Sequence, residues 1–162
     1  MFIARQGSII CAIGNTQDEV ELIMQQALAR NYTIEETNVE YVNYNGTYIT
    51  ADEAREKEAI RIAHLNLTGA DVERGLYQAL NMDFEDVIAK IEKLQPTGLD
   101  IKALKIELKA NNFYRGNPYI DAVGRVLGLT KEQLDEFFET NDYHALMKLE
   151  EVNNEDTANT AN

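Results

Sequence analysis

The sequence predicts an α+β protein: a small N-terminal module of a β-hairpin, a helix and a second β-hairpin, followed by a mostly helical C-terminal half of about six short helices. Before residue 50, the turn pairs Gln6-Gly7 and Asn45-Gly46 separate short apolar runs, which favours hairpins. After residue 50, N-cap signals recur between segments whose apolar residues have helical spacing. We therefore expect a module over 1–50, a helical domain over 51–151 and a polar tail over 152–162.

The first hairpin is expected to join Phe2–Arg5 to Ser8–Ala12. A helix follows, because Thr16 and Glu19 form a capping box: the Thr side chain accepts a hydrogen bond from the Glu19 backbone N–H, and the Glu side chain reaches back. Apolar residues then recur at i, i+3, i+4, i+7 and i+8, which predicts one buried helix face. This face consists of Val20, Ile23, Met24, Ala27 and Leu28.

A second hairpin is predicted over 41–50, after a short strand at Thr33–Thr37. Asn45 and Gly46 are the preferred pair for a type I′ turn, because both central positions need a positive φ. We interpret the tyrosines of this hairpin as cross-strand packing residues rather than as a stacking surface for bases or sugars. A two-residue loop sets the pairs Tyr44–Thr47, Val42–Ile49 and Tyr41–Thr50.

Each later helix is expected to begin after a capping side chain. The helix after Thr50 is predicted to reach about Leu65, and the helix after Asp100 to cover Ile101–Asn111. Pro118 is favoured at a first helical position, and Gly128 at the end of the same helix. Gly124 lies inside that helix, which indicates a close helix crossing. The expected caps are Thr50, Thr68, Asp83, Asp100, Asn117, Thr130 and Asp142.

The charge is strongly negative, with 28 acidic residues against 15 basic ones and a formal net charge of −13. Such a charge repels nucleic acid at long range and suits a partner with a basic surface. Residues 101–129 hold five basic and two acidic residues, whereas residues 130–162 hold two basic and nine acidic ones. The two stretches can pair internally, and the acidic surface can equally be a solvated face. We expect no nucleic-acid partner.

The sequence has no apolar run near the roughly 20 residues of a membrane span, and its start does not have the pattern of a signal peptide. We expect a protein that is not secreted by a signal peptide and that has no membrane partner. Cys11 is the only cysteine, so no disulfide framework is possible within the chain.

No pattern of residues points to catalysis. The nine glycines never form a phosphate-binding loop, and no Gly-x-Ser-x-Gly elbow is present. The two histidines, His64 and His144, are far apart and lack partners at metal-ligand spacing. We expect a non-enzymatic protein with no catalytic residue, no cofactor and no metal.

The stretch FYRGNPYIDAVG, residues 113–124, is the strongest candidate for a binding feature. Asn117 and Pro118 are explained as a helix start, and we expect Phe113 and Tyr119 to staple that corner. Tyr114 and Arg115 are not needed for the turn, and aromatic residues and Arg are enriched at interface hot spots. The predicted partner contact therefore consists of Phe113, Tyr114, Arg115 and Tyr119.

Two segments, YVNYNGTYIT and NNFYRGNPYIDAVGRVLGLTKEQLDEFFETNDY, resemble small uncharacterised proteins encoded among the tail genes of tailed-phage and prophage genomes. The resemblance implies a virion-associated or tail-assembly protein that contacts another protein, either a phage structural protein or a host protein. It implies a location in the bacterial cytoplasm during infection or in the virion. The alternative is an acidic inhibitor that mimics the charge of DNA and binds a host nucleic-acid-binding or defence protein. The oligomeric state stays open.

Overall fold

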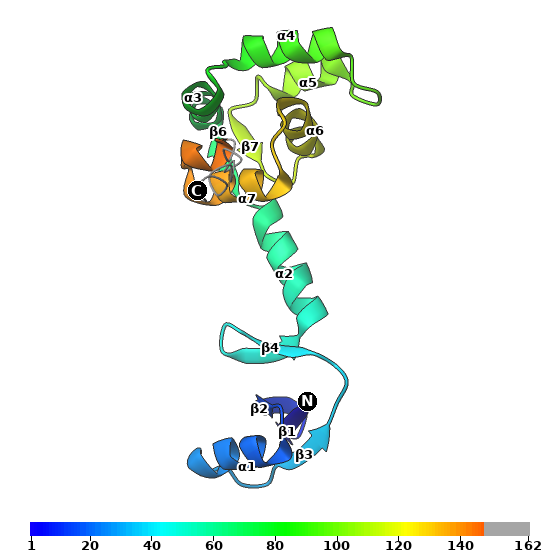
Figure 1. The fold of residues 1–162 in the computed structure, drawn as a ribbon, viewed down its shortest axis with the longest axis vertical. Coiled ribbons are helices and arrows are strands. Elements are labelled where there is room, and N and C mark those ends of the chain that lie inside the picture. Colours follow the sequence, from blue (N-terminus) through cyan, green and yellow to red (C-terminus); the bar gives the residue numbers. More distant parts are fainter. Residues whose placement is uncertain (148–162) are drawn as a thin grey trace, which may run out of the picture. The chain divides into compact units, whose positions relative to one another are not determined.

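The computed structural model describes residues 1–147 and has the expected α+β class (Figure 1). The chain forms two compact units, Met1–Arg61 and Ile62–Asn162. The boundary between them falls inside helix α2, which spans Ala51–Ala63, rather than at residue 50. The expected polar tail, 152–162, lies outside the described residues.

The first unit is built on a three-stranded antiparallel sheet with the strand order β2-β1-β3. Helix α1 packs on one face of this sheet, and its N-terminus has the predicted capping box. The core on this side contains Ala4, Ala12, Val20 and Met24. The elements span Phe2–Gln6 (β1), Ile9–Gly14 (β2), Gln17–Gln26 (α1) and Thr33–Glu36 (β3).

The second hairpin, β4 (Tyr41–Tyr44) with β5 (Thr47–Thr50), lies on the other side of the sheet from α1 (Figure 1). All three predicted cross-strand pairs are present, and both turn residues have positive φ. Arg5 ties the sheet to this hairpin. Its Nε lies 2.5 Å from Glu35 Oε1, and its Nη2 donates a hydrogen bond of 3.2 Å to the Tyr41 hydroxyl.

The predicted apolar face of α1 is only partly buried. Val20 and Met24 are buried, as expected. Ile23 is exposed although it lies within the helix. Leu28 is exposed because the helix is capped at Ala27 and Leu28 turns away from the helical path with φ +54°. The helical spacing therefore does not extend to Leu28.

The second unit is mostly helical, and each of its helices starts behind a predicted cap. Thr68, Asp83, Asn117 and Thr130, for example, each accept a hydrogen bond from a backbone N–H of the first turn. The elements after α2 span Gly69–Leu80 (α3), Phe84–Leu94 (α4), Ile101–Glu107 (α5), Pro118–Leu127 (α6), Lys131–Thr140 (α7) and the 3₁₀ turn η1 at Tyr143–Leu146.

Two short strands were not predicted. Asn66–Thr68 (β6) pairs antiparallel with Asn112–Tyr114 (β7). For this reason α2 ends at Ala63 instead of near Leu65, and α5 ends at Glu107 instead of Asn111. Strands of three residues are too short to show an alternating pattern, and their partner lies far along the chain.

The core of the second unit is a single apolar cluster to which α3, α4, α5, α6 and α7 contribute. Two glycines allow close helix approach, as predicted for Gly124. A Cβ added at Gly124 would lie 2.5 Å from Leu134 Cδ1, and one at Gly75 would overlap the ring of Phe137. The side chains buried most completely are Val87, Ile91, Leu104, Phe137 and Leu146.

Candidate contact site at the β7–α6 corner

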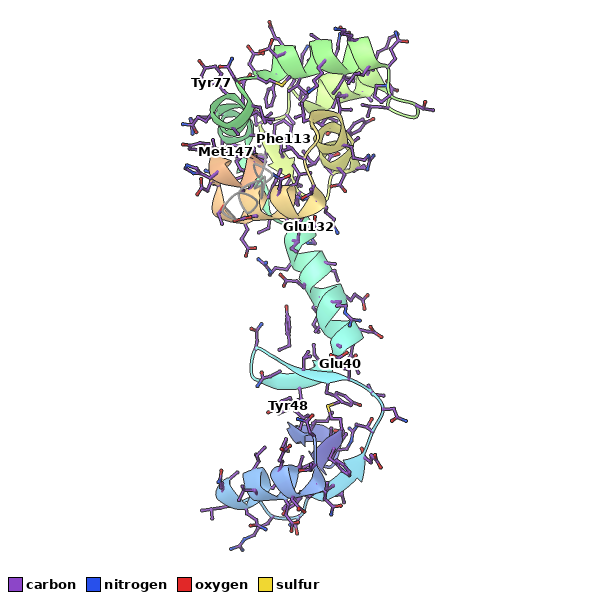
Figure 2. All side chains as sticks on the ribbon, viewed as in Figure 1. Glu40, Tyr48, Tyr77, Phe113, Glu132 and Met147 are labelled. Carbon is purple, nitrogen blue, oxygen red and sulfur yellow. The ribbon has the colours of Figure 1, made fainter. Side chains whose placement is uncertain are left out.

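The four residues of the predicted contact lie at one corner of the second unit but differ in exposure. Phe113 and Arg115 are buried, with exposed fractions of 4% and 3%. Tyr114 is 54% exposed, and Tyr119 is half-buried against the apolar core. Figure 2 shows Phe113 in the interior of the unit, whereas Tyr77 and Met147 lie at its periphery.

The backbone of this corner is held by the end of α2 and by Leu65, the residue before β6. The Arg115 N–H donates to the Leu65 carbonyl at 2.8 Å, and the Gly116 N–H donates to the Ala63 carbonyl at 3.0 Å. A Cβ at Gly116 would lie 2.9 Å from both the Ala63 carbonyl oxygen and Cβ. Glycine is therefore needed here for a close approach to α2.

Asn117 fixes the start of α6 in two ways. Its Oδ1 accepts a hydrogen bond from the Tyr119 N–H at 3.0 Å, which is the predicted cap. Its Nδ2 donates to Glu107 Oε2 at 2.7 Å, which ties the corner to the end of α5. Both polar ends of this side chain are thus used inside the molecule.

Arg115 is an internal residue, contrary to the expectation that the turn leaves it free for a partner. Its Nη1 lies 2.8 Å from Asp121 Oδ1 on α6, and its Nε lies 2.6 Å from Asp135 Oδ1 on α7. Its Nη2 lies 3.5 Å from the Lys131 carbonyl. The guanidinium joins the turn after β7 (Asn112–Tyr114) to α6 and α7, because a buried cation requires charged or carbonyl partners.

Phe113 is also an internal residue. Its ring lies 5.6 Å from that of Phe84 on α4, centroid to centroid, within the core of the unit. Burial removes Phe113 and Arg115 from a surface contact, because a partner cannot reach them without opening the core. A contact role stays a prediction for Tyr114 and Tyr119, of which Tyr114 is the more exposed.

The second unit also contains a cavity of about 50 Å³ behind this corner. Its walls are the apolar residues of the core, and Tyr119 is one of them. Besides the Tyr119 hydroxyl, the polar side chains in its wall are those of Glu107 and Asn117, which are hydrogen-bonded to each other. An apolar lining of this kind offers few groups that can orient a polar substrate.

Several carboxylates at or near the surface have shifted pKa values with local causes. Hydrogen bonding to the Thr68 hydroxyl, assisted by Arg74, lowers the pKa of Asp71. The His144 backbone N–H and ring lower the pKa of Asp142. Both carboxylates lie at helix starts, so these shifts belong to capping. Among residues 1–147, no group of three or more His, Cys, Asp or Glu side chains is placed to hold a metal ion.

No helix in the described part of the chain combines the length and the apolar character needed to cross a membrane. Comparison with protein-family models, curated proteins and solved structures gives no match for this chain.

Asp121 and Asp135 are the residues of this corner that sequence reasoning missed. They follow Arg115 by six and twenty positions, and neither spacing brings side chains together on one helix. The only signal was that Asp121 and Asp135 lie on two successive predicted helices, one on each side of the turn at Gly128. That signal does not separate them from the other carboxylates of an acidic chain.

Proposed function

We propose that the chain is a non-enzymatic assembly protein that acts through protein–protein contacts, as a virion-associated or tail-assembly component. The observation that supports this proposal most directly is the exposure of Tyr114 between two buried neighbours, Phe113 and Arg115. The resemblance of the segment around this corner to proteins encoded among phage tail genes supports the proposed setting.

The geometry of the corner suits a contact residue. The backbone at Tyr114 is held in the β6–β7 pair, and the residues on either side are fixed by burial. An exposed aromatic side chain on a rigid backbone loses little conformational entropy when it binds. Tyrosine is also enriched among the residues that contribute most to protein interfaces.

The alternative, an acidic inhibitor that mimics DNA charge, receives less support. Many carboxylates are used inside the chain, where they cap helices or pair with a nearby base. Glu92 lies 2.6 Å from Lys105, and Asp71 both pairs with Arg74 and bonds to Thr68. Such carboxylates are placed by local structure, whereas charge mimicry requires a continuous acidic face.

The test uses cells in which the gene for the chain is deleted and restored by variants. Mass spectrometry of purified virions and of tail-assembly intermediates measures whether the chain is incorporated, and the titre of infectious particles measures assembly. We expect Tyr114→Ala to reduce both, because it removes the exposed ring and leaves the buried neighbours in place.

Tyr77→Ala is the matched control, since Tyr77 is another exposed tyrosine of the same unit, on α3. It is expected to leave incorporation and titre unchanged. The proposal is wrong if the chain is absent from virions and intermediates and its deletion leaves assembly unaffected.

A further inference from the structure

The turn of the second hairpin contains a pair of residues that can react with each other. Asn45 is the only asparagine of the chain that is followed by glycine, which is Gly46. An asparagine side chain is one of the less durable groups of a protein, because the backbone nitrogen of the next residue can attack its amide carbon. A following glycine favours the attack, since it has no side chain to hinder the approach and leaves the backbone free to rotate.

The reaction at this pair is an intramolecular displacement. The Gly46 backbone nitrogen loses its proton to solvent and bonds to Asn45 Cγ. The bond from Cγ to Nδ2 breaks, Nδ2 takes up a proton and leaves as ammonia, and a five-membered succinimide ring remains. Water then opens the ring. Addition of water at Cγ gives aspartate, whereas addition at the Asn45 backbone carbonyl carbon gives isoaspartate, in which the main chain runs through Cβ and Cγ.

Solvent reaches both residues of the pair. Asn45 and Gly46 are exposed, and no heavy atom beyond the chain neighbours of Gly46 lies within 4 Å of the place where its Cβ would stand. The water that opens the ring is therefore available at the turn. The conformation of the turn itself is what opposes the reaction in the folded chain.

The backbone of the folded turn keeps the reacting atoms apart. Asn45 and Gly46 have φ +51° and +84°, as a type I′ turn requires. In such a turn the ψ of the first residue holds its Cβ and the next nitrogen on nearly opposite sides of the Cα–C bond. The succinimide ring needs both on the same side. The turn must therefore open before the ring can form.

Asn43 opposes the reaction in a second way. Its Oδ1 accepts a hydrogen bond from the Gly46 N–H at 2.9 Å. The attacking nitrogen is thus engaged, and the loss of its proton is opposed, because a hydrogen bond to the protonated form favours that form. Asn43 is exposed and lies in β4 opposite Tyr48, so its side chain is not part of a core.

We propose that Asn45 is a site of spontaneous deamidation, and that Asn43 is the residue that slows this reaction in the folded chain. Local opening of the hairpin end releases the site, so the deamidated fraction records how often the turn has opened. This inference concerns the first unit and does not rest on the proposed function, which concerns Tyr114 in the second unit.

The two products differ in their effect on the hairpin. Aspartate keeps the length of the main chain, and Asp-Gly is itself a favoured type I′ pair. Isoaspartate adds a main-chain atom to a two-residue loop, so the Tyr44–Thr47 pair no longer closes over the same turn. Tyr41 of this hairpin binds Arg5 of the sheet, and an isoaspartate at position 45 should weaken that tie.

The test measures deamidation of the full chain by mass spectrometry of its peptides, during incubation at mildly alkaline pH in heavy-oxygen water, which labels the new carboxylate. Isoaspartate is counted separately by enzymatic methylation of isoaspartyl groups. The wild type is compared in its folded state and in concentrated urea, where the turn is lost. We expect Asn45 to react at least about tenfold more slowly in the folded chain, because the turn must open first.

Asn43→Val is the decisive variant, because valine removes the acceptor yet favours a strand and pairs well with a tyrosine opposite. In the folded chain it should speed deamidation of Asn45 by about two- to tenfold, the factor that corresponds to one net hydrogen bond. In urea it should react at the wild-type rate. The thermal unfolding midpoint of the variant is measured alongside, to separate loss of the hydrogen bond from loss of folding.

Two further variants match this one. Asn43→Asp keeps an acceptor oxygen at the same position and should stay as slow as the wild type. Asn38→Val removes an exposed asparagine outside the hairpin and should leave the rate at Asn45 unchanged.

Three results would overturn the proposal. An Asn45 that stays intact in urea would show that the pair is not a deamidation site. Equal rates for the folded and the unfolded wild type would show that the turn does not control the reaction. A folded Asn43→Val chain that reacts no faster than the wild type, or one that reacts faster in urea as well, would remove the role of Asn43.

Discussion

Arg115 holds three elements of the second unit together from a position that is almost fully buried. The two aspartates that neutralise it differ in exposure: the Asp121 side chain is 42% exposed and the Asp135 side chain 22%. If the ion pair with Arg115 is broken, water can solvate the more exposed carboxylate, Asp121, better than it can solvate Asp135. The three charges therefore do not contribute equally to stability.

We expect Arg115→Ala to destabilise the second unit by about 3 kcal/mol, because it leaves two aspartates facing an emptied site. Asp135→Asn should cost more than Asp121→Asn, in the order of their burial. Urea unfolding followed by circular dichroism measures these differences. Equal effects of the two Asn variants would contradict the interpretation, and so would an Arg115→Ala protein as stable as the wild type.

Gly124 illustrates how a small residue sets the distance between two helices. Gly124→Ala places a methyl group against Leu134 and is expected to cost about 1–3 kcal/mol through overpacking. In a Leu134→Ala background the same change should instead stabilise the protein, by about 0.5–1 kcal/mol, because only the gain in helix propensity remains. A double-mutant cycle by chemical denaturation tests this reversal; additive effects would rule out direct contact.

At the scale of the element, the capping boxes connect sequence to structure most directly. In α2 the Glu53 N–H donates to Thr50 Oγ1 at 3.1 Å, while the Thr50 N–H and hydroxyl donate to Glu53 Oε2. The Thr50 backbone N–H, followed by its hydroxyl, lowers the pKa of Glu53 below the ordinary value of 4.5. Protonation of this carboxylate therefore removes part of the cap.

The pH dependence of α2 stability follows from that shift. Because the folded pKa is below the unfolded one, the ionised Glu53 stabilises fully above pH 4.5, and its contribution is lost as the pH falls through the folded pKa. We expect Glu53→Gln to be less stable than wild type at pH 7 and the difference to shrink below pH 4.5. Urea titrations at both pH values measure it, with Glu56→Gln on the same helix as the control. A difference that does not change with pH would refute this role.

The elements that follow local rules were predictable from sequence, and those that depend on distant partners were not. Thr16, Asp83 and Thr130 mark helix starts through side chains a few residues from the groups they bind. The β6–β7 pair and the Arg115 ion pairs join residues that are far apart or at spacings without local meaning. The composition of residues 113–119 marked out this corner as a candidate site, but the burial that divides its residues depends on the tertiary fold.

At the scale of the whole molecule, the two units have separate cores, one around Val20 and Met24 and the other around Leu104 and Phe137. We expect core substitutions to act on one unit at a time. Val20→Ala should lower the stability of the first unit, and Leu104→Ala that of the second by about 2–5 kcal/mol. Hydrogen exchange of amides in both units measures the effect. A Val20→Ala protein with equally faster exchange in the second unit would contradict separate cores.

The pairing of β6 with β7 closes the intervening helices α3, α4 and α5 into one loop of chain. The cost of closing a flexible loop rises only with the logarithm of its length, by about 0.6 kcal/mol for each doubling. Gly98 lies in the turn between α4 and α5, and no heavy atom beyond its two chain neighbours lies within 4 Å of the place where a Cβ would stand. A peptide inserted after Gly98 should therefore leave equilibrium stability nearly unchanged, which makes this turn the position of choice for an internal tag or tether.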